Sequence, residues 1–236
     1  MQPDFAVNER FSLQTQYAGR ERQPVFIIDD YLRDPEALVN YAAKDARFEP
    51  SPALYPGIVA SAPDAYCESL LNVLGPLLGE TFAVKVDTAY LTNCFFALVT
   101  YPPSQLHYRQ LLPHIDDYGA GVIAGVHFLC DSTQGGTALF RHRATGYESL
   151  TVEKNQQLQK MIAQDIASHG PLPAQYMAGD NRLFEQTTCL QPKFNRLVIY
   201  RGSILHSMIV NAHTKLDPNP RVGRLTINTF LRFEST

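Results

Sequence analysis

Apolar and polar residues follow different patterns on either side of about residue 80. Before that point, the apolar run PVFIIDDYL (24–32) predicts a short buried strand. Asp34, followed by proline and glutamate, predicts the start of a helix that ends near Ala46. Leucine and valine then recur at helical spacing, which predicts a second helix within 61–78. We expect both helices to pack on one face of a sheet.

From Thr81 onwards, β-branched and aromatic runs alternate with clusters of proline, glycine and asparagine. The runs expected to form strands are TFAVKV, AYLTNCFFALVTY, VIAGVHFL, TALFRH, NRLVIYR, ILHSMIV and RLTINTFLRF. Short strands separated by turn residues are typical of a sandwich or barrel of the jelly-roll kind. Apolar residues return to helical spacing at about 149–169, which predicts a helical insertion between two strands.

These elements predict a mainly β protein with flanking α-helices. The sequence contains no internal repeat and no linker that would divide it, so we expect a single domain over 1–236. Residues 1–80 would supply the N-terminal strand and helices, and residues 81–236 the jelly-roll core. The composition, 45% apolar and 18% charged, is typical of a soluble globular protein.

Charge and cysteine content exclude several classes of function. The net charge of -3 and the lack of any lysine- or arginine-rich run argue against nucleic acid or an anionic membrane as a partner. The first residues show no secretory signal, and no stretch approaches membrane-spanning length, so we expect a cytoplasmic protein. Four cysteines without a CxxC pair are more typical of buried reduced thiols than of a zinc ribbon or redox couple.

The segment PHIDDYGAGVIAGVHFLC contains the first candidate chemistry. His114 and Asp116 lie two residues apart, ahead of a run that alternates like a strand. Seven histidines and 23 acidic residues in 236 positions give about 0.7 such pairs by chance, so the pair alone carries no information. In an extended segment, however, residues two apart point to the same side and could reach one ion.

Two later segments add further candidates. His206 lies in RGSILHSMIV, although a lone histidine on a strand is more often a core or surface residue than a ligand. In GRLTINTFLRF, alternation places Arg224, Thr226 and Asn228 on one face. An arginine beside a hydroxyl suits a carboxylate, and a solvated outer face is the alternative.

The order of these residues makes them a joint pattern. A His-x-Asp segment, a distal histidine on a late strand and an Arg-x-Thr on the last strand rarely occur together by chance. Two histidines and one carboxylate on one face of an octahedral ion are the ligand set of non-haem Fe(II), with three positions left open.

With these motifs, the chain resembles the Fe(II)/2-oxoglutarate-dependent oxygenases, and within them the prolyl-4-hydroxylase-like branch. The likeness runs roughly from Tyr90 to Phe233. Its motifs are YP at 101–102, PHIDD, VHFL, GGTALF at 135–140, NRLVIYRGSILHS and RLTINTF. The N-terminal IIDDYLRDPEAL also looks like the usual lead-in of such enzymes.

The resemblance implies a double-stranded β-helix of the cupin-like, jelly-roll kind. It assigns the iron ligands to His114, Asp116 and His206, and it assigns the distal carboxylate of 2-oxoglutarate to Arg224 with help from Thr226. The implied activity is that of a dioxygenase. It would hydroxylate a C–H bond of a peptide side chain, an amino acid or a small metabolite, using dioxygen and 2-oxoglutarate and releasing succinate and CO2. Asp116 favours hydroxylation, because related halogenases have a small residue at this position.

Several positions depart from the family pattern. Arg221 is a rival to Arg224 as the carboxylate anchor, because the interval after His206 is long. Phe128 stands where close relatives often have a tyrosine, and Tyr101 is a candidate for the missing hydroxyl, with a core role as the alternative. We expect His127 to have a core role or to support the ligands from behind, and we expect Arg141–Arg143 to form a solvated edge.

Two other functions fit the same residues. One is a cupin-like metal-dependent enzyme that does not use 2-oxoglutarate, and the other is a non-catalytic jelly-roll binding module. The insertion at 149–169 and the loop after His206 are plausible lids over the site, because loops on a rigid scaffold usually carry specificity. A homodimer is expected from the general frequency of dimers.

Overall fold

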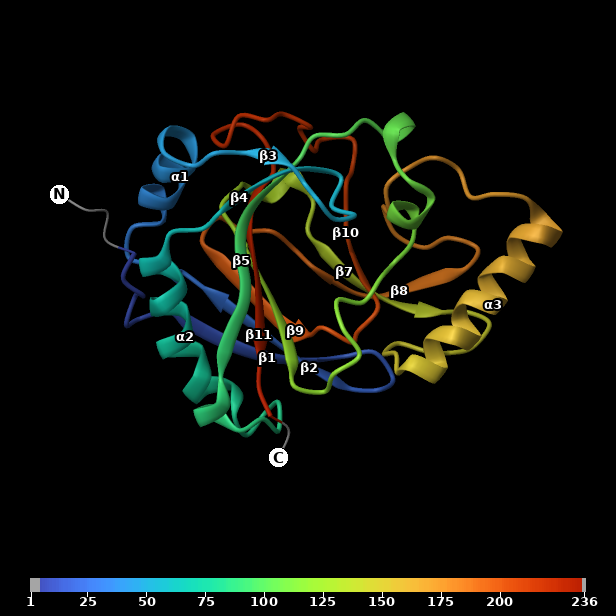
Figure 1. Ribbon diagram of the computed structural model, residues 1–236, viewed down its shortest axis with the longest axis horizontal. Coiled ribbons are helices and arrows are strands. Elements are labelled where there is room, and N and C mark those ends of the chain that lie inside the picture. The colour runs from blue at the N-terminus through green and yellow to red at the C-terminus, as the bar shows by residue number, and fades with distance from the viewer. Residues whose placement is uncertain (1–4, 235–236) are drawn as a thin grey trace.

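Two antiparallel sheets pack against each other to form the body of the protein (Figure 1), and the computed structural model describes residues 5–234. The large sheet contains, in spatial order, β1 (Ser12–Ala18), β2 (Gln23–Asp29), β9 (Arg196–Arg201), β6 (Val122–Phe128), β11 (Leu225–Arg232), β5 (Tyr90–Val99), β4 (Gly57–Ser61) and β3 (Glu49–Pro50). The small sheet contains β10 (His206–Met208), β7 (Thr137–His142) and β8 (Phe184–Leu190).

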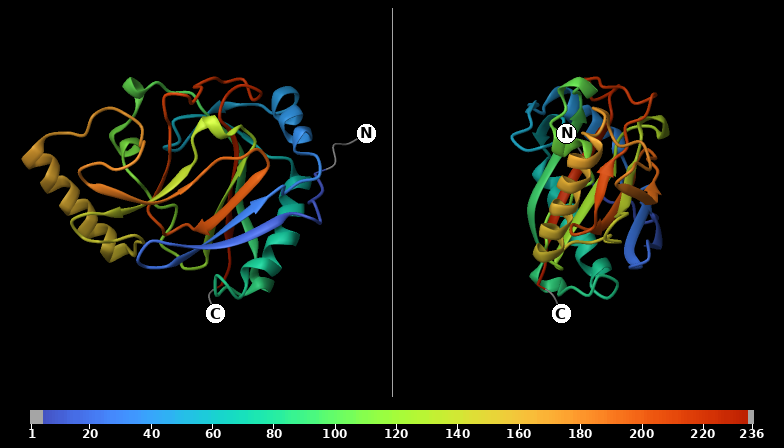
Figure 2. Two further views of the ribbon diagram at one scale, coloured as in Figure 1. Left: turned by 180° about the vertical axis from the view of Figure 1, so that it is seen from behind. Right: turned by 90° about the vertical axis from the view of Figure 1, so that its right-hand side faces the viewer.

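Helices cover the outer face of the large sheet and one end of the small sheet. α1 (Pro35–Lys44) and α2 (Asp64–Leu78) lie on the same side of the large sheet (Figure 1), where Leu38 and Leu70 join its core. A second core cluster lies between the two sheets, and a third joins the small sheet to α3 (Val152–His169). Figure 2 shows α3 at the far end from α1 and α2. The helices therefore pack outside the space between the two sheets, with α1 and α2 on the large sheet and α3 beside the small sheet.

The predicted helices form where the capping residues indicate. Asp34 caps α1, since its carboxylate accepts a hydrogen bond from the Ala37 N–H at 3.3 Å. α3 follows Thr151, whose hydroxyl accepts from the Lys154 N–H, and it confirms the helical insertion. Four short 3-10 segments complete the regular structure of residues 5–234: η1 (Val86–Thr88), η2 (Pro103–Gln105), η3 (Tyr108–Leu111) and η4 (Ser132–Gln134).

The structure corrects some of the predicted elements. TFAVKV, expected as a strand, forms turns instead, and Phe82 packs edge-to-face on Phe26 with ring centroids 5.1 Å apart. Its apolar residues seal the core at the end of α2 and add no strand. β1, β3, β4 and β8 were not predicted from the sequence. β1, β3 and β8 are edge strands that are polar or very short, so they give no apolar run to recognise. β4 is an interior strand, but its apolar run within GIVAS is too short to identify.

Two further observations bear on the sequence predictions. The four cysteines are free thiols, and two of them, Cys94 and Cys130, are buried while the other two are half-buried. Among residues 5–234, no helix is both long and apolar enough to span a membrane.

Candidate metal centre

Backbone pairing brings the two candidate ligand segments together. His114 exchanges two hydrogen bonds of 2.9 Å with His206, from N–H to C=O in each direction, and the Asp116 N–H donates to the Gly202 carbonyl at 2.8 Å. A Cβ on Gly202 would lie 2.9 Å from a Val122 methyl group and 3.4 Å from the Asp116 Cβ. The glycine therefore allows the His-x-Asp segment to lie close to the turn before β10.

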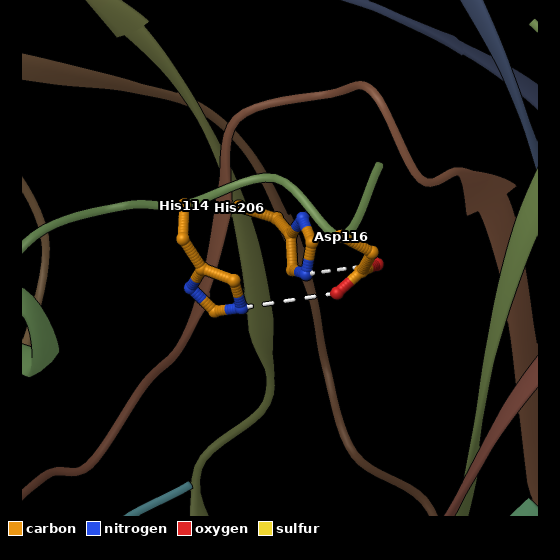
Figure 3. Close-up of side chains that lie close together, drawn as sticks. All are labelled: His114, Asp116 and His206. Carbon is orange, nitrogen blue, oxygen red and sulfur yellow. Dashed lines mark ion pairs between the residues drawn. The ribbon is translucent and has the colours of Figure 1, made fainter. Parts of the chain in front are cut away.

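The three candidate ligand side chains converge on one point (Figure 3). His206 Nε2 lies 3.5 Å from Asp116 Oδ2, and His114 Nε2 lies 4.0 Å from Asp116 Oδ1. One ligand atom from each residue can be chosen so that all three lie within 4.8 Å of one another. The side chains of His206 and Asp116 are 7% and 14% exposed, whereas that of His114 is 56% exposed. The group thus has two sheltered ligands and one at the open side.

The facing atoms of His206 and Asp116 are both hydrogen-bond acceptors. His206 Nδ1 lies 2.8 Å from the Ile204 carbonyl, so this nitrogen carries the proton and Nε2 presents a lone pair. Burial lowers the pKa of His206 to about 4 and raises the pKa of Asp116 to about 6. Asp116 Oδ2 is buried and has no hydrogen-bond partner among the described residues. A cation between these atoms would satisfy both, and the residues therefore fit a divalent metal.

Arg224 is a buried cation without a carboxylate partner in the described part of the chain. It is 2% exposed, and its guanidinium donates from Nε to the Gly135 carbonyl at 3.0 Å and from Nη2 to the Gly136 carbonyl at 2.9 Å. Its Cζ lies 5.6 Å from the centre of the Phe128 ring. Arg141, another buried arginine, pairs with two glutamates. Because burial of an unpaired charge is costly, an anion bound next to the Arg224 guanidinium would be stabilised.

The Gly135-Gly136 turn allows its two carbonyls to accept hydrogen bonds from Arg224. Gly135 has a φ of +77°, and a Cβ there would lie 2.1 Å from the Ile209 carbonyl oxygen. A Cβ on Gly136 would lie 2.1 Å from the Leu190 carbonyl oxygen. Only glycine fits both positions, and the two carbonyls are then free to accept from the guanidinium.

One cavity of about 810 Å³ contains the metal-ligand group and Arg224. Its floor comes from β5, β6, β9 and β11 of the large sheet, and its other walls come from β10, α3 and the loops 53–56 and 108–118. Beyond the metal ligands and Arg224, the only charged side chain among the described lining residues is that of Arg109. The other polar and aromatic lining includes Tyr55, Asn93, Phe95, Tyr118, Asn155, Gln159, Tyr176, Tyr200, Asn228 and Phe230.

Tyr55 is a site residue that sequence reasoning missed. It lines the cavity beside Arg224 and Thr226, and its buried hydroxyl makes no well-formed hydrogen bond to a described residue. Burial raises the pKa of Tyr55 to about 12, and the Arg224 guanidinium opposes that shift. The surrounding sequence SPALYPG carries no motif, so no signal in it could have identified this tyrosine.

The other candidate residues lie at different distances from the cavity. Thr226 is buried beneath it and donates to Asn228 Oδ1 at 3.3 Å. Tyr101 is not among the described side chains that line the cavity, and its carbonyl accepts from the Tyr176 hydroxyl at 2.7 Å. Arg221 is exposed and donates to Asn40 Oδ1 at 2.5 Å, outside the cavity lining.

His127 and Arg141–Arg143 take part in structural contacts. His127 lies in the core on the opposite face of β6, 3.1 Å from the Tyr66 hydroxyl and 3.2 Å from Asn195 Oδ1. Arg141 pairs with Glu148 and Glu185 and is buried, which contradicts the expected solvated edge at this position, whereas Arg143 is exposed and pairs with Asp180. His127 and Arg141 therefore hold parts of the fold together.

Comparison with known proteins gives one family and several related folds. The model of a family of unknown function, DUF6445, matches residues 9–231. None of the curated proteins matches the sequence. The structure is similar to that of the non-heme alpha ketoglutarate dependent epimerase SnoN from nogalamycin biosynthesis, with a TM-score of 0.52, 9% identity, and coverage of 90% of this chain and 79% of that one.

Other solved structures contain a metal together with 2-oxoglutarate. SnoN in complex with Fe3+, alpha ketoglutarate and nogalamycin RO gives a TM-score of 0.50 at 11% identity, over 90% of this chain and 80% of that one. HygX from Streptomyces hygroscopicus, with nickel and 2-oxoglutarate bound, gives a TM-score of 0.47 at 8% identity, over 90% and 84%. At these identities, the likeness to SnoN shows a shared fold.

Proposed function

The chain belongs to DUF6445, a family of unknown function, and we propose that this member is an Fe(II)- and 2-oxoglutarate-dependent dioxygenase. One observation carries the proposal. A single cavity holds a buried pair of facing acceptors that lacks a cation and a buried arginine that lacks an anion among the described residues. An iron ion and the carboxylate of 2-oxoglutarate would supply the two missing partners at once. The fold of SnoN supports the same reading.

In this proposal, different residues bind the metal and the co-substrate. His114, Asp116 and His206 would hold the ion on one face, and the Ile204 carbonyl keeps the His206 tautomer correct for binding. Bound iron would supply, with 2-oxoglutarate and dioxygen, the oxidising power to hydroxylate a substrate C–H bond. Arg224 would orient the distal carboxylate, and Tyr55 would donate a hydrogen bond to it.

Arg224, which has no carboxylate partner among the described residues, supports this proposal over the competing functions. A cupin-like enzyme that uses the metal alone would have no need for a buried cation facing its cavity. A non-catalytic module would need neither a cation at the His206–Asp116 pair nor an anion at Arg224. We therefore favour a hydroxylase on a jelly-roll scaffold, and the presence of Asp116 favours hydroxylation over halogenation. The prolyl-4-hydroxylase-like branch and a cytoplasmic location stay predictions from the sequence.

A small-molecule substrate fits the cavity better than a peptide. Its outer part presents amides and aromatic rings, with Arg109 as the one charged residue described there away from the metal and co-substrate groups. α3 and the loop 108–118 wall the cavity instead of leaving an open groove for an extended chain. SnoN, which shares the fold, has been solved with the small molecule nogalamycin RO. We propose a largely uncharged small metabolite.

The test uses the protein under anaerobic conditions. Fe(II) and 2-oxoglutarate added together should give the weak visible charge-transfer band of the chelate, whereas either one alone should give none. In air, 2-oxoglutarate should then be converted slowly to succinate even before a substrate is found. Absence of both the band and succinate would reject the proposal.

Replacement of Tyr55 by phenylalanine should weaken 2-oxoglutarate binding by about tenfold, because one hydrogen bond to a charged carboxylate is lost. Metal affinity should not change. Thermal stability should be unchanged, because the hydroxyl has no partner among the described residues to lose. Titration of the charge-transfer band measures the 2-oxoglutarate affinity.

Tyr176→Phe is the matched control for this variant. Tyr176 also lines the cavity, but its hydroxyl already donates to the Tyr101 carbonyl at 2.7 Å. Its loss should lower the melting temperature and leave 2-oxoglutarate affinity as it was. If the two variants behave alike, Tyr55 does not contact the co-substrate.

A further inference from the structure

β1 forms an open edge of the large sheet. It pairs in register with β2 over all seven residues, Ser12–Ala18, and within residues 5–234 no strand pairs with its other side. Figure 2 shows the strand at the outside of the molecule. Its outward N–H and C=O groups are therefore a template for one more strand.

The composition of β1 is unusual for an exposed edge. Its sequence, SLQTQYA, contains no charged residue and no proline, and its pairing with β2 shows no bulge. The opposite edge of the same sheet is β3, which has two residues, Glu49 and Pro50. Proteins usually protect edges with short strands, charges or proline, as β3 does. β1 has none of these protections.

The apolar side chains of β1 lie together and face solvent. Leu13 is 39% exposed and Tyr17 is 52% exposed, and alternation puts them on one face with Thr15. Their partners Ile28 and Pro24 on β2 continue this face toward the core below α1 and α2. A strand added beyond β1 would place its own side chains beside Leu13 and beside Tyr17, whose ring also has the Arg22 guanidinium 5.1 Å from its centre.

We propose that β1 pairs antiparallel with β1 of a second copy of this chain, around a two-fold axis at Thr15. This register pairs the seven-residue strand along its whole length. Leu13 then lies opposite Tyr17 of the partner subunit, Gln14 opposite Gln16 of the partner subunit, and Thr15 opposite Thr15 of the partner subunit. Ser12 lies opposite Ala18 of the partner subunit, and the three central pairs join like with like or apolar with aromatic, which are favourable cross-strand combinations.

Self-pairing suits this edge better than a foreign strand does. No charge within the strand would select a partner of opposite sign, and none would repel an identical strand. No residue of β1 or β2 is among the described residues that line the cavity, so both cavities of the dimer stay open. The proposal is therefore independent of the function proposed for the cavity.

The experiment measures the molar mass of the full chain by sedimentation equilibrium. The wild-type protein should be a dimer, and Thr15→Lys and Thr15→Glu should each raise the dissociation constant at least about tenfold, because two like charges would face each other across the axis. Mixing the two variants in equal amounts should restore the dimer, since the contact across the axis would then join a lysine to a glutamate. Circular dichroism would check that the exposed substitutions leave the fold intact.

Thr15→Val is the matched control. It keeps a β-branched residue and adds no charge, so it should remain dimeric. A wild-type monomer at every concentration would overturn the proposal. A dimer that persists in both charged variants, or a mixture that stays monomeric, would also overturn it.

Discussion

Asp116→Ala is expected to lower Fe(II) affinity by more than about 100-fold and to abolish succinate formation. Loss of a group that only supports a metal ligand costs about 10- to 100-fold in affinity, so loss of the one charged ligand should cost more. The remaining pair, His114 and His206, would bind the ion without its neutralising carboxylate. Anaerobic titration of the apoprotein with Fe(II) measures the change, and Asp116→Glu should restore part of the affinity.

Asp117→Asn is the matched control, because it removes a carboxylate from the adjacent position. Asp117 pairs with Arg232 at 2.6 Å and accepts a hydrogen bond from the Gly119 N–H, and it is not part of the metal-ligand group. This variant should lose some stability and keep its iron. Equal iron affinity in Asp116→Ala and the wild type would show that the metal lies elsewhere.

Arg224→Met is expected to raise the dissociation constant of 2-oxoglutarate by at least about 100-fold. A buried charge pair costs about 2–5 kcal/mol when one partner is truncated, which corresponds to about 30- to 4,000-fold, and the burial of Arg224 favours the upper part of this range. Metal binding should persist, since Arg224 is not a ligand in the His-Asp-His group. Titration of the charge-transfer band at a fixed Fe(II) concentration separates the two effects.

The structural role of Arg224 has to be separated from binding. Its guanidinium also holds the Gly135 and Gly136 carbonyls, so the melting temperature should fall in this variant. Arg221→Gln is the control, because Arg221 lies three residues away in the sequence, is exposed, and donates a hydrogen bond to Asn40. Normal 2-oxoglutarate affinity in Arg224→Met would exclude Arg224 as the anchor, and a loss of affinity in Arg221→Gln would identify Arg221 instead.

Much of the fold could be predicted where side-chain chemistry is local. The cap at Asp34 and the strict alternation of β11 are encoded in neighbouring residues, and both elements lie where expected. The prediction of a strand at TFAVKV was wrong, because an apolar run indicates burial and does not distinguish a strand from a turn that packs on the core. β1 and β8 were missed for the opposite reason, since an edge strand needs no apolar side.

The residues of the candidate site were also predictable only where the signal is local in the sequence. His114, Asp116, His206 and Arg224 were visible in the sequence because they occur in spaced motifs, and the structure brings all four to one cavity. Tyr55 reaches that cavity from a loop about sixty residues earlier, and only the tertiary fold decides its position. Tyr101 was chosen by motif position, whereas its side chain is not in the lining of the described cavity.

Backbone hydrogen bonds hold His114 against His206 and Asp116 against the turn at Gly202. Because these bonds do not involve the side chains of the proposed metal site, little of the free energy of metal binding would be needed to order the chain. We expect iron bound at this proposed site to exchange without unfolding, from the side of the exposed His114. We expect the apoprotein to be a stable, readily reloaded form, so that the iron supply of its surroundings sets how much of it is active.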